Sequence, residues 1–251
     1  MINRMSTGRL DGKRVFLTGA GGGLVAAIAR AYAAEGATQV LAGRTLGRVQ
    51  EVAGELDAAE AVQLDVSDAS AVQAAVEAAH GRMGGLDVVV NGAAIDTGWA
   101  PSADMELEVW DSTIAINLSG TYYVCRAAIP LMVADGGGAI LNITSVAGHK
   151  AWAEDVAYNA SKAGVRQMTK TIAVEYATQG IRANCLAPGV IDGGLTDTVT
   201  DDADREMLVK MHPMMRMGTT AEVAEAAVWL ASDASSFTTG WTLAVDGGFL
   251  A

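Results

Sequence analysis

The chain has 251 residues, a length that suits one open α/β sheet as well as two small domains. Hydrophobic residues make up 51% of it and aromatic residues only 5%, so a large core of small side chains is expected. The net charge of −12 argues against nucleic acid and anionic membranes as partners. Any recognition of phosphate must therefore be local, through backbone N–H groups or a well-placed cation.

Cysteines and histidines are few and scattered. Cys125 and Cys185 are far apart, and neither they nor the three histidines have the spacing of a metal site. We expect reduced thiols and no metal. The N-terminal segment lacks the apolar stretch of a signal peptide, and no run approaches the roughly 18 apolar residues of a membrane helix. These features predict a cytoplasmic protein that does not enter a membrane.

Short apolar runs alternate with longer, alanine-rich segments along the chain. The runs expected as strands are Arg14–Thr18, Gln39–Ala42, Ala61–Leu64, Asp87–Val90, Ala139–Ile143, Arg182–Ala187 and Thr242–Val245. The segments expected as helices are Val25–Glu35, Ala69–Arg82, Asn117–Ala134, Tyr158–Thr178 and Thr220–Ser232. This alternation predicts one α/β domain over residues 1–251, a Rossmann-type doubly wound parallel sheet of about seven strands with helices on both faces.

Residues 192–218 fit neither pattern. The segment is polar at first and then rich in methionine, with five methionines from Met207 to Met217. Flexible thioether side chains adapt to a ligand, so we predict a substrate-binding lid. The alternative is a surface helix with some methionines in the core.

A glycine-rich loop follows the first expected strand. Its residues are Thr18, Gly19, Ala20, Gly21, Gly22, Gly23 and Leu24. Glycine lets a pyrophosphate approach the backbone closely, and a helix that begins near Gly23 would aim free N–H groups at the phosphates. A loop at this position indicates a dinucleotide site rather than a flexible surface turn.

The next strand ends agree with a dinucleotide. Asp65 and Val66 follow the third strand, where a carboxylate can accept a hydrogen bond from an adenine amine. Asn91-Gly92-Ala93-Ala94 follows the fourth, where small residues let a ribose lie against the backbone. Either alone could be a turn signal, but their succession favours binding.

The end of the second strand bears on the choice of cofactor. The carboxylate that usually holds the ribose 2′-OH of NAD is expected at Gly43, and Arg44 and Thr45 follow. Glycine removes the repulsion of a 2′-phosphate, which Arg44 can bind. The glycine loop has no basic residue, so one strong cation is expected. We predict that NADP(H) is preferred and NAD(H) possible; alternatively, Arg44 stacks on the adenine and serves either cofactor.

Tyr158 and Lys162 are four residues apart and would share one face of a helix. An ammonium group stabilises the phenolate, and lowering the pKa of tyrosine from about 10 to about 7 requires roughly 4 kcal/mol. Ser145, just after the fifth strand, could hydrogen-bond the same substrate oxygen. Asn117 opens the long helix before that strand, where a helix cap and a catalytic role are both open.

Over nearly its whole length the chain resembles the short-chain dehydrogenase/reductase family. The matching motifs are Thr18-Gly19 with Gly23, Asp65, Asn91-Gly92-Ala93-Ala94, Asn117, Ser145, Tyr158 with Lys162, Pro188-Gly189 and Val245-Asp246-Gly247-Gly248. The resemblance implies that Tyr158 is the acid/base, that Lys162 lowers its pKa and binds the nicotinamide ribose, and that Ser145 polarises the substrate. It implies that Asn117 holds a water in a proton relay to Lys162. Pro188, Gly189 and Ile191 would flank the nicotinamide, with the Ile191 backbone on its carboxamide.

Three positions depart from the family pattern. Val25 replaces the third glycine of the loop, Gly92 replaces the second asparagine of Asn-Asn-Ala-Gly, and Gly193 stands where a threonine is common. Val25 is expected to shift the helix or to weaken cofactor binding. The departures concern affinity more than chemistry.

These motifs predict hydride transfer between a nicotinamide cofactor and a ketone or secondary alcohol. An apolar or cyclic substrate is expected if His149, Trp152, Leu195 and the stretch Met207–Met215 line the pocket, although His149 could be a plain surface residue. The alternatives are a non-catalytic dinucleotide-binding regulator and a reductase of C=C bonds. The resemblance also implies a homotetramer, in which the helices at 117–134 and 158–178 and the apolar C-terminus contact other copies; alternatively, both helices only cover their own sheet.

Overall fold

The computed structural model describes residues 8–193 and 201–251. Seven parallel strands form one sheet in the order β3-β2-β1-β4-β5-β6-β9. They are β1 (Arg14–Thr18), β2 (Thr38–Gly43), β3 (Ala59–Gln63), β4 (Val88–Asn91), β5 (Gly138–Ile143), β6 (Ile181–Pro188) and β9 (Thr242–Val245). The strand order reverses direction between β1 and β4, which confirms the predicted doubly wound sheet.

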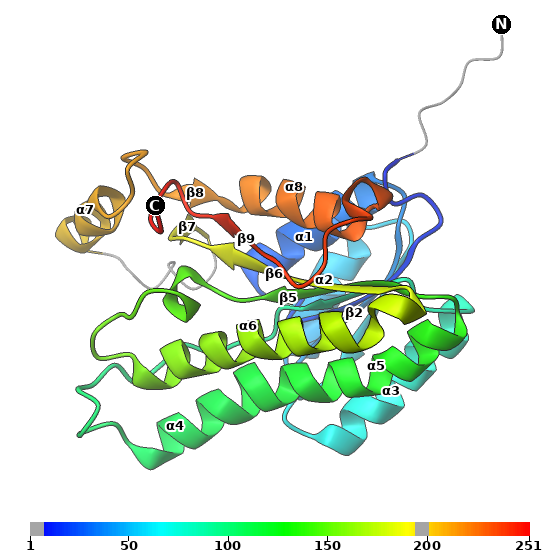
Figure 1. Cartoon of the computed structure of the whole chain (residues 1–251), viewed down its shortest axis with the longest axis horizontal. Helices are drawn as coiled ribbons and strands as arrows, with labels where there is room; N and C mark the ends of the chain where they lie inside the picture. The colour runs from blue at the N-terminus through cyan, green and yellow to red at the C-terminus, as the bar shows by residue number, and fades with distance from the viewer. Residues whose placement is uncertain (1–7, 194–200) are drawn as a thin grey trace, which may run out of the picture.

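Helices cover both faces of the sheet (Figure 1). They are α1 (Gly23–Ala34), α2 (Leu46–Gly54), α3 (Ala69–Met83), α4 (Leu107–Thr113), α5 (Thr121–Ala134), α6 (Val156–Tyr176), α7 (Asp202–Lys210) and α8 (Thr220–Ala231). Successive strand residues point to opposite faces, so Val15 and Leu17 pack with α1 and α8 while Phe16 packs with α3 and α5. The inner strands of the sheet are therefore buried on both sides, whereas the edge strands β3 and β9 are partly exposed.

The helix expected to begin at Asn117 begins much earlier. Leu107–Thr113 continues into a π-helical stretch, Ile114–Gly120, and then directly into α5. Asn117 therefore lies inside a continuous helix, and the helix-cap interpretation is wrong. Helix α2 was not expected because Gly47 and Gly54 weaken its helical propensity; buried Val49 and Val52 hold it on the sheet.

The segment 192–218 contains helix α7 between two short strands, β7 (Ile191–Asp192) and β8 (Gly218–Thr219), which pair with each other. Asp201 caps α7 by accepting hydrogen bonds from the backbone N–H groups of Ala203 and Asp204. Met207, Met214 and Met215 are exposed, so these three are not core residues. Leu195 lies outside the described residues, and the role of the segment as a lid stays a prediction.

Within the two described ranges, no helix is both long and apolar enough to cross a bilayer.

Candidate active site

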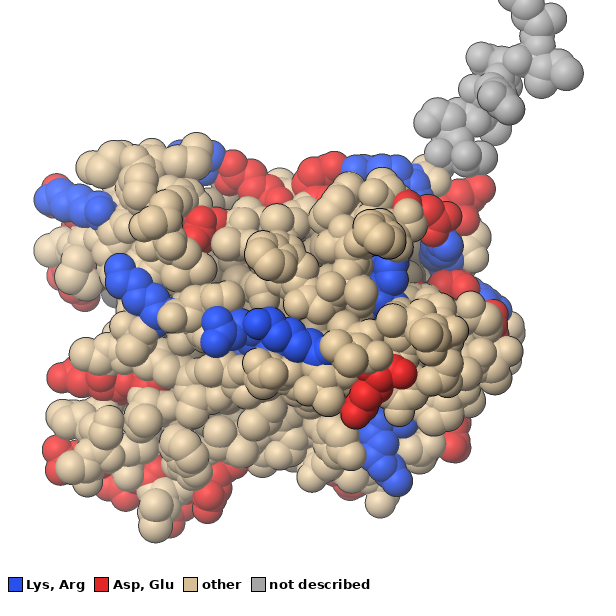
Figure 2. Space-filling view, in the orientation of Figure 1, with Lys and Arg blue, Asp and Glu red and all other residues tan. Residues whose placement is uncertain are grey.

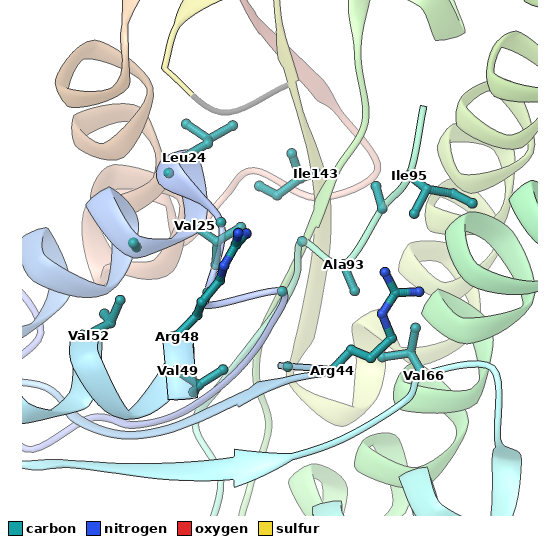
Figure 3. Close-up of a pocket in the computed structure, with 18 of the residues that line it drawn as sticks. Leu24, Val25, Arg44, Arg48, Val49, Val52, Val66, Ala93, Ile95 and Ile143 are labelled. Atoms are coloured by element: carbon teal, nitrogen blue, oxygen red, sulfur yellow. The ribbon is translucent and has the colours of Figure 1, made fainter. Parts of the chain in front are cut away.

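A cleft of about 780 Å³ opens at the C-terminal ends of the central strands. It crosses the switch point between β1 and β4, where a doubly wound sheet binds its ligand. Most of the predicted site residues line it: Gly19, Gly21, Gly22, Gly23, Leu24, Arg44, Asp65, Val66, Gly92, Ala93, Ser145, Tyr158, Lys162, Pro188, Gly189 and Ile191. Figure 3 shows part of this lining.

The glycine loop forms the floor of the cleft beside α1. Gly19 has φ +79°, and a Cβ there would lie 2.6 Å from the backbone nitrogen of Ala93, so only glycine fits. Gly22 precedes the first residue of α1, and no side chain caps this end of the helix. The N-terminal amides of α1 are thus available to a phosphate, as a dinucleotide requires.

Two of the departures from the family pattern compensate each other. A Cβ at Gly92 would lie 2.4 Å from Cγ2 of Val25, so the side chain of Val25 occupies the space that a residue larger than glycine would need. Helix α1 still begins at Gly23, and Val25 is buried against the end of β4. The third departure has a backbone reason: Gly193 has φ +100°, where a threonine would be strained.

Arginines line the end of the cleft where the adenosine is predicted to bind. Arg44 extends from the end of β2 and Arg48 from the first turn of α2 (Figure 3), and both line the cleft. The expectation of a single cation is therefore wrong; Arg48 was missed because helix α2 was missed. Asp65 lies nearby, and its Oδ1 accepts hydrogen bonds from the Ser67 hydroxyl (2.6 Å) and backbone N–H (2.9 Å), which lower its pKa.

Tyr158, Lys162 and Ser145 meet at the opposite end of the cleft. Tyr158 and Lys162 lie one turn apart on α6, with Nζ of Lys162 5.4 Å from the centre of the tyrosine ring. Lys162 donates a 3.0 Å hydrogen bond to the carbonyl oxygen of Ile143, at the end of β5. Ser145 lies close enough to the Tyr158 phenol to lower its pKa. The structure therefore brings these three predicted side chains together.

Burial is the main cause of the pKa shifts at this end of the cleft. Burial raises the pKa of Tyr158, and the negative charge of Asp96 adds to the increase; the side chain of Ser145 acts in the opposite direction. Burial likewise lowers the pKa of Lys162 to about 8. Burial of the phenolate is the largest cause of the increase at Tyr158, and the lowering of this pKa by Lys162 stays a prediction.

Two predicted asparagines lie behind the cleft rather than in its wall. The Asn117 side chain accepts a 2.8 Å hydrogen bond from the N–H of Ile95 and donates to the Ile95 carbonyl (2.8 Å) and the Ser161 hydroxyl (3.2 Å). It thereby ties the segment after β4 to α6. Asn91 is buried and donates a 2.8 Å hydrogen bond to Oδ1 of Asn142. The proposed water relay through Asn117 stays a prediction.

The predicted substrate residues are placed differently. His149 is exposed, and its Nδ1 lies 2.9 Å from a guanidinium nitrogen of Arg166. Trp152 stacks on Phe249 near the C-terminus, with ring centres 5.8 Å apart. Neither is among the residues that line the cleft. Their position in the sequence between Ser145 and Tyr158 keeps them near the site, but it does not determine which way their side chains point.

Two carboxylates near Tyr158 were not anticipated. Asp96, in the segment after β4, accepts a 3.1 Å hydrogen bond from the indole of Trp99, and burial raises its pKa. Asp155 immediately precedes α6, and burial together with the charge of Asp96 raises its pKa to about 7. Both raise the pKa of Tyr158. No spacing in the sequence connects these two residues, since only the fold brings them together.

Comparisons with known proteins agree with this geometry. A family model described as enoyl-(acyl carrier protein) reductase matches residues 19–250. D-threitol dehydrogenase of Mycolicibacterium smegmatis is 40% identical over 245 residues, covering 96% of this chain and 94% of the relative. The 3beta-hydroxysteroid dehydrogenase 1 of Eggerthella lenta is 41% identical over 249 residues, covering 95% of this chain and 94% of the relative.

A solved structure is also similar over nearly the whole chain. It is a gluconate 5-dehydrogenase from Burkholderia cenocepacia in complex with NADP and tartrate, 37% identical, with a TM-score of 0.92 and coverage of 96% of each chain. Together with the glycine loop after β1 and the Tyr158–Lys162 pair on α6, this similarity shows that the chain belongs to the short-chain dehydrogenase/reductase family, which acts on CH–OH groups with NAD(P).

Proposed function

We propose that the protein interconverts a secondary alcohol and a ketone, with NADP(H) as its preferred cofactor. The observation that carries the proposal is the grouping of Tyr158, Lys162 and Ser145 at one end of a cleft whose other end suits a dinucleotide. The nicotinamide supplies or takes the hydride when bound.

The chain's own residues handle the substrate oxygen and its proton. Ser145 and Tyr158 hold that oxygen between two hydroxyl groups, and Tyr158 donates its proton in reduction and accepts one in oxidation. The Ile143 carbonyl fixes the ammonium of Lys162 beside the Tyr158 ring. A phenolate at Tyr158 therefore forms beside a positive charge, which offsets part of its desolvation. Turnover of a panel of ketones and secondary alcohols by the wild type and by Tyr158→Phe tests this assignment.

The preference for NADP(H) rests on the end of β2. Position 43 carries no carboxylate, and Arg44 borders the cleft directly after it. The related gluconate 5-dehydrogenase was solved with NADP. The ratio of kcat/KM for NADPH and NADH tests the preference, and a wild-type preference for NADH of more than about tenfold, roughly 1.4 kcal/mol, would contradict it.

For the substrate, the first candidate, from the sequence, is an apolar or cyclic alcohol, but His149 and Trp152, which suggested it, do not line the cleft. A polyol is the second, because Asp96 and Asp155 place carboxylates near Tyr158 that can accept hydrogen bonds from neighbouring hydroxyl groups. The relatives include enzymes named for both classes, a steroid and a four-carbon polyol. We would compare kcat/KM for a cyclic ketone and for a polyol in the wild type and in Asp96→Asn. Loss of polyol turnover alone in the variant would select the second candidate.

We further propose a homotetramer. Large apolar side chains are exposed on α5 (Tyr122), α6 (Val174) and α8 (Trp229) and in the segment between α8 and β9 (Phe237 and Trp241). Figure 2 shows one face of the molecule, where wide uncharged areas surround a short band of Lys and Arg. Phe249, by contrast, is buried against Trp152 of its own chain. Sedimentation analysis of the wild type and of Trp241→Glu tests the assembly.

A further inference from the structure

Arg48 occupies a position that the sequence motifs do not reveal. A Cβ built on Gly21 would lie 3.1 Å from Cβ of Arg48, so the stem of the arginine lies against the glycine loop. Arg48 and Gly21 line the same part of the cleft, together with Gly43 and Arg44. Helix α2 thus places a positively charged side chain beside Gly21, in a glycine loop that has no basic residue of its own.

The charged groups around Arg48 leave its guanidinium group available to a ligand. Within residues 8–193 and 201–251, it forms no ion pair or side-chain hydrogen bond. Glu55, which also borders the cleft, is paired with Arg30 at 2.6 Å, and one oxygen of Asp65 is held by Ser67. Glu51 is the remaining carboxylate of this part of the lining, and it lies on α2 itself.

The dipole of helix α2 does not favour this arginine. Arg48 lies in the first turn, where the helix macrodipole disfavours a cation. Its neighbour Val49, in contrast, is fully buried and anchors the helix below the cleft. Thr45 borders the cleft and its side chain does not cap α2, so the first amides of this helix have no side-chain partner there. The first turn of α2 is therefore built to receive negative charge from outside the chain.

We infer that Arg48 is a specificity-determining residue, which together with Arg44 clamps the phosphate on the ribose 2′-oxygen of NADP(H). A phosphate monoester carries a charge between about −1.5 and −2 at neutral pH, more than one guanidinium neutralises. Two arginines from separate elements can each donate charge-assisted hydrogen bonds to its oxygens. The neutral 2′-hydroxyl of NAD(H) offers Arg48 no such partner. The inference rests on the proposed preference for NADP(H) and names the second residue that produces it.

The direct test is the binding of 2′,5′-ADP and 5′-AMP, which differ only in the 2′-phosphate, by calorimetry. We expect Arg48→Ala to weaken 2′,5′-ADP about tenfold or more and 5′-AMP less than twofold. Arg48→Lys should restore part of the loss, because it keeps the charge but not the planar fork. Arg82→Ala is the matched control: it also removes one positive charge, from α3, where Arg82 pairs with Glu60, and it should change neither affinity.

The outcomes separate the two proposals. If the wild type prefers 2′,5′-ADP and Arg48→Ala keeps the same preference, the role of Arg48 is wrong while the cofactor preference stands. Equal weakening of both nucleotides by Arg48→Ala would also overturn the role, because it would show a contact to the shared adenosine. If the wild type binds both nucleotides equally, the preference for NADP(H) fails and the inference fails with it.

Discussion

The two ends of the cleft are built in different ways. At the catalytic end, Tyr158 and Lys162 are 8% and 3% exposed, and a hydrogen bond to β5 fixes Lys162. At the end proposed to bind adenosine, Arg44 and Arg48 are exposed. Buried groups in fixed geometry act strongly in a low dielectric, whereas exposed charges are screened by water and salt. Single substitutions should therefore lower the reaction rate by orders of magnitude at the first end. At the second end they should lower the affinity for the cofactor about tenfold.

The largest effect is expected from Tyr158→Phe. Removal of the phenol hydroxyl removes the proton donor, a role worth roughly 10²–10⁴-fold in rate. The affinity for 2′,5′-ADP should stay within a few-fold, because Tyr158 lies at the other end of the cleft. Steady-state kinetics and calorimetry on one preparation give both values. A variant that keeps more than about a tenth of the wild-type rate would show that Tyr158 is not the acid/base.

The next effect concerns the cofactor. Arg44→Ala should raise the KM for NADPH about tenfold more than the KM for NADH, because only the phosphate pairs with the guanidinium. Gly43→Asp should shift the preference towards NADH. A Cβ at Gly43 would lie 2.8 Å from Cγ2 of Val49, so the double variant Gly43→Asp/Val49→Ala separates the charge effect from the steric one. An unchanged NADPH-to-NADH ratio in both Gly43 variants would contradict this account.

A smaller effect tests the packing between the two ends. Gly92→Ala should destabilise the fold by about 1–3 kcal/mol, because the new Cβ would lie 2.4 Å from Val25. Val25→Gly should remove that clash, so the double variant should be more stable than the sum of the single changes predicts. Urea unfolding of the four proteins measures the coupling. Strictly additive free energies would show that Val25 and Gly92 do not compensate each other.

The smallest effect is on the pH dependence of stability. Asp155 has its pKa raised from 3.8 to about 7 in the folded protein. Between these values the unfolded chain loses this proton and the folded chain keeps it, so the contribution of Asp155 to stability is lost as the pH rises. Asp155→Asn keeps a side chain that suits the N-terminus of α6. It should make the fall in unfolding free energy between about pH 4.5 and pH 8 less steep. An equally steep fall in the variant would rule out Asp155 as its source.

The sequence predicted those features that depend on local spacing. The strands, the glycine loop and the Tyr158–Lys162 pair follow from residue periodicity and from one turn of a helix. Asn117 was misplaced because no local signal marks a π-helical stretch inside a longer helix. Arg48 reaches the cleft, and Asp96 and Asp155 come near Tyr158, only through tertiary packing. Such residues carry no motif, so the structure was needed to find them.

The most direct test of the account follows the hydride itself. The enzyme would be given NADPH deuterated at both C4 positions, with a panel of ketones and of conjugated C=C substrates, and the products would be analysed by mass spectrometry. We expect deuterium on the carbinol carbon of an alcohol product with the wild type, and no labelled product above background with Tyr158→Phe. Deuterium found only on a former C=C carbon, or cofactor binding without labelled product from any ketone, would contradict the assignment.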